Sequence, residues 1–209
     1  MYNGSMQRQV FVASLTFAVL APGGVRAQES SVRLKGTIAA LEGSVLTVNA
    51  GTGTARITLD DKLRVNLEEP ADLAKIAPGD FIGSGAVPQP DGTMRAVEVH
   101  VFDESMRGTG EGFRPWTGAP NGTMTNATVR EIATATVDKV AGRVLALKYN
   151  GGEQRLFVSP DTPVIRYSPG QRSALTVGAH VRVNATKHAD GTLSAAGVTV
   201  GKNGYVPPV

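Results

Sequence analysis

Residues 76–101, IAPGDFIGSGAVPQPDGTMRAVEVHV, return 99 positions later as residues 175–200, LTVGAHVRVNATKHADGTLSAAGVTV. The Asp91-Gly92-Thr93 turn falls on Asp190-Gly191-Thr192, and Val99 falls on Val198. The same offset holds without a gap back to Lys35. Because glycines and apolar positions keep one offset over the whole stretch, the chain contains a duplicated unit.

Each unit is predicted to consist of short strands. Apolar and β-branched residues recur at near-alternate positions, and Gly-containing turns separate them. Asp91-Gly92 indicates a hairpin, after which Val97, Val99 and Val101 are expected to face inward. The segment 70–77 suits one or two helical turns with Leu73 and Ile76 inward. This order predicts an all-β protein of two tandem small OB-like β-barrels, with small β-sandwiches as the alternative.

The first residues are typical of a secretory signal peptide. Arg8 precedes an apolar run at 10–21, and Val25-Arg26-Ala27 forms an A-x-A-like cleavage site. Twelve apolar residues are too few for a membrane span, which needs about 20. We therefore expect cleavage after Ala27, a periplasmic or secreted protein, and no membrane span after signal cleavage.

The predicted organisation has five parts: a signal peptide (1–27), a first OB-like β-domain (32–102), an ordered Gly/aromatic connecting segment (103–130), a second OB-like β-domain (131–203) and a C-terminal tail (204–209).

The charge and the cysteine content exclude some classes of protein. Residues 1–27 hold two of the 21 basic residues and no acidic one, so 19 basic and 18 acidic residues remain. Binding of nucleic acid, which draws much of its affinity from neutralised phosphates, is disfavoured by this balance. There is no cysteine, so neither a disulfide framework nor a thiolate metal site is expected.

The connecting segment has no counterpart in the repeat and holds the only tryptophan. Its large and charged side chains are unusual for a flexible linker. They could pack between the domains, or they could line a groove and bind a ligand or partner. The candidate binding residues are Arg107, Glu111, Phe113, Arg114 and Trp116.

Residues 107–116 (RGTGEGFRPW) and 123–127 (TMTNA) resemble a signature of exported bacterial proteins that form a domain-of-unknown-function family with OB-like β-domains. The resemblance covers essentially the whole mature chain and implies a bacterial periplasmic setting. A histidine often stands in that family where Phe113 stands here, so the resemblance gives this position no metal or acid–base role. It implies no activity.

No catalytic constellation is evident. His100, His180 and His188 lack metal-ligand spacing, and His100, beside the inward valines, is expected to be exposed. Glu68-Glu69 is expected in a solvated turn. Gly108-x-Gly110-x-Gly112 lacks the context of a dinucleotide loop. We expect no enzyme, no cofactor and no metal site, although Met94, Met106, Met124 and His100 would suit copper(I) if they met.

These observations favour a non-enzymatic periplasmic binding or assembly module with an unknown protein or small-molecule partner. The first alternative is a metal-handling accessory protein for copper or zinc. The second is an OB-type binder of single-stranded nucleic acid, which would need exposed aromatic residues on its strands.

Overall fold

The structure is a computed structural model that describes residues 29–51, 53–137 and 139–207; the predicted signal peptide lies outside these residues. The protein is all-β, as predicted. Its strands are β1 (Ser30–Glu42), β2 (Val45–Ala50), β3 (Gly53–Pro70), β4 (Phe81–Pro88), β5 (Met94–Phe102), β6 (Gly112–Pro115), β7 (Thr123–Val137), β8 (Val140–Tyr149), β9 (Gly152–Val158), β10 (Val164–Gly170), β11 (His180–Lys187) and β12 (Leu193–Gly201). The short 3₁₀ helices are η1 (Leu73–Lys75), η2 (Glu104–Met106), η3 (Arg172–Ala174) and η4 (Lys202–Gly204).

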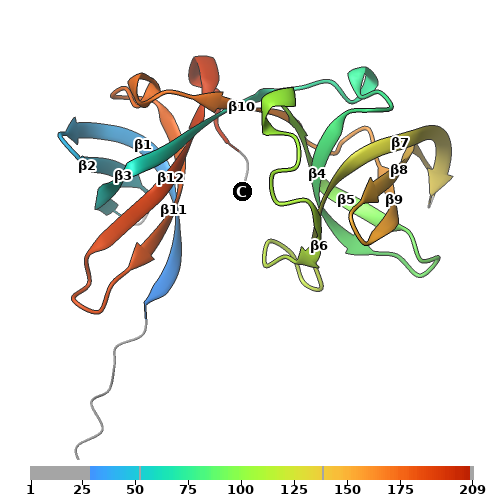
Figure 1. Cartoon of the computed structure of the whole chain (residues 1–209), viewed down its shortest axis with the longest axis horizontal. Helices are drawn as coiled ribbons and strands as arrows, with labels where there is room; N and C mark the ends of the chain where they lie inside the picture. The colour runs from blue at the N-terminus through green and yellow to red at the C-terminus, as the bar shows by residue number, and fades with distance from the viewer. Residues whose placement is uncertain (1–28, 52, 138, 208–209) are drawn as a thin grey trace, which may run out of the picture.

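The strands close two five-stranded barrels (Figure 1). In the first barrel, β1, β2 and β3 form an antiparallel meander, and β11 and β12 complete the ring. The closure between β12 and β3 is parallel. In the second barrel, β7, β8 and β9 form the meander, β4 and β5 complete the ring, and β5 pairs with β9 in parallel. None of the described residues forms a helix long and apolar enough to span a membrane.

The two repeats exchange their C-terminal hairpins. The β11–β12 hairpin of the second repeat completes the barrel that the first repeat begins, and the β4–β5 hairpin of the first repeat completes the other. Figure 1 shows this as red strands beside blue ones in one barrel and green strands beside yellow and orange ones in the other. The ranges 32–102 and 131–203 are therefore repeats of sequence, and each barrel is assembled from both.

A local twofold axis relates the two repeats, and the exchanged hairpins lie on either side of it. The second half of β3 pairs antiparallel with β10, its equivalent 99 residues later. At the centre of this ladder Glu68 lies opposite Tyr167, and the offset makes these two residues equivalents of each other. Any group at this point lies where the two barrels meet.

Each barrel has its own apolar core, drawn from both repeats. In the first barrel Leu46 and Ile57 pack with Val183 and Val198, and in the second Ile82 and Val99 pack with residues of β7–β9. Aliphatic side chains dominate both cores, as the low aromatic content predicts. The helical turn predicted at 70–77 is η1, after which Ile76 is buried.

The predicted orientation of one residue in β5 is wrong because the strand contains a β-bulge. Gly85 pairs with Glu98 but Ala86 pairs with Ala96, so Val97 is an extra residue in β5. The extra residue shifts the alternation of inward and outward side chains. As a result Val97, which was predicted to face inward, is 40% exposed, and Ala96 takes the inward position.

The connecting segment is ordered and lies along the surface of the second barrel. It contains η2 and β6, and β6 pairs with β7 alone. The strand β7 begins at Thr123, inside the range 103–130 that was predicted to be connecting segment.

Candidate functional site

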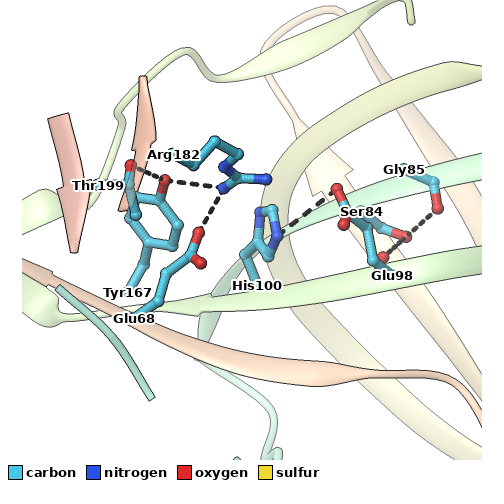
Figure 2. Close-up of polar contacts among 8 residues, drawn as sticks. All are labelled: Glu68, Ser84, Gly85, Glu98, His100, Tyr167, Arg182 and Thr199. Carbon is cyan, nitrogen blue, oxygen red and sulfur yellow. Dashed lines mark hydrogen bonds and ion pairs between the residues drawn. The ribbon is translucent and has the colours of Figure 1, made fainter. Parts of the chain in front are cut away.

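A polar cluster lies at the junction of the two barrels, around the central pair of the β3–β10 ladder (Figure 2). Glu68 is fully buried, and its Oε1 accepts a hydrogen bond from Nη2 of Arg182 on β11. The same nitrogen donates to the Tyr167 hydroxyl, 3.2 Å away, which lies 2.9 Å from Oγ1 of Thr199 on β12. A carboxylate on the first repeat is thus bonded to an arginine of the second, and this arginine is hydrogen-bonded in turn to Tyr167 of the same repeat.

The cluster continues onto β5 of the second barrel. Glu98 and His100 point to the same side of this strand, and Oε1 of Glu98 lies 3.6 Å from Nε2 of His100. The imidazole also contacts the Tyr167 ring, at 5.3 Å between ring centres. Oγ of Ser84 on β4 donates to the backbone oxygen of Glu98 at 2.9 Å, which fixes this part of the strand. Contacts therefore connect Thr199 in one barrel to Ser84 in the other (Figure 2).

The two carboxyl groups respond differently to their surroundings. Burial raises the pKa of Glu68, and the charge of Arg182 offsets this only in part. Burial acts in the same direction on Glu98, but the contact with His100 and the charges of Arg182 and Arg33 outweigh it and hold the pKa of Glu98 below its ordinary value. Burial and the neighbouring Glu68 carboxylate raise the pKa of Tyr167.

Two atoms of the cluster are buried without a hydrogen-bond partner: Oε2 of Glu68 and Nε2 of His100. The only other such side-chain atom among the described residues is Oδ1 of Asn126. An unsatisfied buried polar atom costs about 1–3 kcal/mol, so native proteins keep few, and each calls for a structural or functional reason.

The cluster opens into a pocket of about 150 Å³ between the barrels. A cavity of this size holds a molecule about as large as benzene. The walls come from β1, β5, β7, β11 and the connecting segment. The lining residues are Arg33, Glu98, His100, Trp116, Met124, Arg182 and Asn184.

A larger hollow of about 500 Å³ adjoins this pocket, and Asn184 lines both. Tyr167 and Thr199 also line the hollow, so the hydrogen bonds that begin at Arg182 extend beneath both spaces. The other lining residues are Arg64, Asn66, Met106, Thr109, Thr186, Ala196 and Gly197.

Of the five predicted binding residues, Trp116 is the one that lines the junction pocket. Its six-membered ring packs against Gly85 of β4, where an added Cβ would lie 2.7 Å from the ring carbons. The next residue, Thr117, accepts a hydrogen bond from Nη2 of Arg33 at 3.2 Å. Because Arg33 belongs to β1, this bond ties the connecting segment to the first barrel.

Arg107 and Glu111 make contacts within the fold. Arg107 forms a two-point ion pair with Glu104, at 2.5 and 2.6 Å, and donates to the Gly79 carbonyl at 2.8 Å. Oε1 of Glu111 accepts a hydrogen bond from the backbone N–H of Asn150 at 2.9 Å. Both contacts fasten the connecting segment to the second barrel.

Phe113 and Arg114 lie on β6. Phe113 is 47% exposed and is the one large aromatic side chain on the surface of the described residues. Nη1 of Arg114 donates to the Gly110 carbonyl at 2.8 Å. These two residues do not line the junction pocket, and a binding role for them stays a prediction.

The residues at the centre of the cluster were missed by sequence reasoning. His100 does point outward from its strand, but it is 8% exposed because the other barrel covers that face. Glu68 lies on a continuous strand and not in the predicted solvated turn, because β3 runs on to Pro70 to pair with β10. A signal was present in the polar Glu98-x-His100 pair, which interrupts a valine-rich strand.

The three methionines and His100 do not all come together at one place. Met94 lies in the core of the second barrel and Met106 lines the larger hollow, so only Met124 joins His100 in the pocket. His188 contacts Glu29 and Ser194 at 3.0 and 2.8 Å. Among the residues that the structure describes, no group of three His, Asp or Glu side chains could hold a metal ion.

No family model, curated protein or solved structure matches this chain. The resemblance to the domain-of-unknown-function family therefore stays a prediction.

Proposed function

We propose that the protein is an exported, non-enzymatic binding module whose ligand site is the pocket at the junction of its two barrels. The carrying observation is the pair of polar side chains Glu98 and His100, which line the pocket although each is more than nine-tenths buried. Their polar atoms lie in a site from which most water is excluded, where a hydrogen bond to a ligand is electrostatically stronger than in water.

The composition of the pocket supports binding in preference to catalysis. Its buried polar groups contact each other: Arg182 binds Glu68, and Oε1 of Glu98 lies 3.6 Å from Nε2 of His100. Among the residues that the structure describes, no serine, threonine, cysteine, lysine or tyrosine lines this pocket, so it offers no hydroxyl, thiol or amine nucleophile. We further propose that the barrels are of the OB type, since each has a three-stranded meander followed by a parallel closure, and that they act in the periplasm.

A thermal-shift screen tests the proposal. The purified protein is heated with single compounds from three classes: neutral sugars, amino acids and small carboxylic acids. A ligand at about 100 times its Kd stabilises the native state by roughly 2.7 kcal/mol, which raises the melting temperature measurably.

The shift should disappear in Arg33→Ala, which removes one wall of the pocket, and should persist in Arg114→Ala, a matched surface arginine outside it. The proposal fails if no compound shifts the melting temperature. It also fails if the shift is the same in Arg33→Ala as in the parent protein.

Copper(I) handling is the second candidate, because an imidazole and the Met124 thioether line the same pocket and both are ligands for this ion. Calorimetric titration with copper(I), copper(II) and zinc tests it, with Met124→Leu as the comparison. Binding weaker than about 10 μM, or binding that Met124→Leu leaves unchanged, would rule it out.

A further inference from the structure

We infer that the junction pocket and the hollow beside it take a neutral polyhydroxylated ligand, a saccharide of more than one ring. This inference rests on the proposed function and specifies the class of ligand for the same site.

The charges of the pocket are balanced before any ligand arrives. Arg182 forms an ion pair with Glu68 beneath the pocket, and Arg33 is one of the charges that lower the pKa of Glu98. The arginines and the carboxylates therefore match in number. An anionic or cationic ligand would leave one charge without a counterpart in a partly desolvated site, which is costly. A neutral ligand avoids this cost.

The hydrogen-bonding groups of the pocket are mixed in kind. The Glu98 carboxylate only accepts, the Arg33 guanidinium only donates, and the Asn184 amide does both. Oε1 of Glu98 and Nε2 of His100 are 3.6 Å apart, too far for a hydrogen bond to each other. A hydroxyl group donates and accepts at once, so it suits a lining that offers both kinds of group. Neighbouring hydroxyls on a sugar ring can serve the remaining groups.

The adjoining hollow is also lined mainly by polar groups, and it gives the ligand its length. Six of its ten lining residues carry uncharged hydroxyl or amide groups, among them Asn66, Tyr167 and Thr199, and Arg64 is its single charged residue. Met106 adds an apolar surface for the C–H face of a ring. Because Asn184 lines both spaces, a chain of two or more sugar rings can occupy them together.

Titration calorimetry with defined probes tests the inference. The saccharide probes are cellotetraose, maltotetraose and tetra-N-acetylchitotetraose, and the comparison probes are glycine, leucine and sodium acetate. We expect at least one tetrasaccharide to bind with a Kd of about 1 mM or tighter. Asn184→Ala should weaken this binding about tenfold, the usual effect of losing one or two hydrogen bonds. Asn150→Ala, on the turn between β8 and β9, is the matched control and should bind as the parent protein does.

The outcomes separate the two proposals. If glycine, leucine or acetate binds in an Arg33-dependent way and no tetrasaccharide binds tighter than about 10 mM, the saccharide inference is overturned and the binding site stands. If none of the six probes binds, both fall. Tetrasaccharide binding that is unchanged in Asn184→Ala and Arg33→Ala would overturn the assignment to this site.

Discussion

Replacing Arg182 by Met probes the buried cluster most sharply. The substitution keeps an unbranched apolar stem of similar reach but removes the guanidinium that donates to Glu68 and Tyr167. The Glu68 carboxylate then stays in the interior without its charged partner. Removing one partner of a buried ion pair typically costs 3–5 kcal/mol.

The pH sets a ceiling on the cost, because Glu68 can take up a proton instead of staying charged. Burial favours the protonated form of this carboxyl group, and the Arg182 guanidinium favours the ionised form. An ordinary glutamate has a pKa of about 4.3, and each pH unit above it adds about 1.36 kcal/mol to the cost of protonation. Protonation of Glu68 therefore limits the loss of folding free energy to about 3.7 kcal/mol at pH 7 and about 1 kcal/mol at pH 5.

The direction of the pH dependence follows from the linkage between proton binding and folding. In Arg182→Met the pKa of Glu68 in the folded state rises further above its unfolded value, so the penalty is absent below the unfolded pKa and grows as the pH rises through the folded pKa. Urea unfolding at pH 5 and pH 7 measures it. We expect a loss of up to about 3.7 kcal/mol at pH 7 that shrinks by more than half at pH 5.

Two further variants make the test decisive. Adding Glu68→Gln to Arg182→Met should restore stability at pH 7 and remove the pH dependence, because the amide carries no charge. Lys187→Met, an exposed position on the same strand, should change stability by less than about 0.5 kcal/mol. A loss in Arg182→Met that is equal at both pH values would refute the reasoning, since it would show that packing and not charge is the cause.

Two more predictions concern the walls of the pocket. Gly85→Ala should lower the free energy of unfolding by about 1–3 kcal/mol and shift the fluorescence of Trp116, the only tryptophan, because the new methyl group meets the indole ring. Gly51→Ala, where an added Cβ has no neighbour within 4 Å, is the control. Equal effects of the two substitutions would contradict the packing of Trp116 on Gly85. Glu98→Gln should lower stability at pH 7 but flatten its decline in acid, because the lowered pKa of Glu98 gives stability that is lost as the pH falls through the folded pKa. Urea midpoints at pH 7 and pH 4 measure this, and an unchanged slope would exclude a role for Glu98 in the acid response.

Much of the fold could be predicted from the periodicity. The glycines that keep the offset between the repeats occupy turns with positive φ, such as Gly79 with Gly178 and Gly92 with Gly191. Only glycine adopts this backbone conformation without strain. Turn positions are local properties of the chain, so the strands between them could be placed as well.

The exchange of hairpins could not be predicted, because the two repeats offer nearly the same apolar faces. Ile82 on β4 and Val181 on β11 are equivalent positions, as are Ala86 and Ala185, and all four are buried in a barrel core. The choice between the partners is made by long-range pairing, which leaves no local pattern.

The candidate site was missed for the same reason. The outward face of β5 is predicted from the sequence to be exposed to solvent, and only the first barrel, which packs against it, buries Glu98 and His100. The connecting segment stood out in the sequence through its composition, and its Trp116 does reach the pocket. Arg107 and Glu111 stood out equally, yet they fasten the segment to the barrel.

The exchange of hairpins is the central claim, because it brings together the strands that form the junction and its pocket. Disulfide formation between engineered cysteines tests it most directly. The chain has no cysteine, so an engineered pair is free of competition. Ser31 lies opposite Thr186 in the β1–β11 ladder. Cα atoms of such pairs are about 4.5–5.5 Å apart, within the range of a disulfide. Without exchange, Ser31 would instead face Val87, the equivalent of Thr186 in its own repeat.

The two double variants, Ser31→Cys with Thr186→Cys and Ser31→Cys with Val87→Cys, are oxidised mildly and mapped by mass spectrometry of non-reduced peptides. Ser30 with Lys187, the next pair in the ladder, is made in parallel because adjacent pairs differ in side-chain spacing. We predict an intramolecular disulfide between positions 31 and 186 in the monomer, with the 31 and 87 pair left reduced. A disulfide between positions 31 and 87, with none to β11, would contradict the exchange.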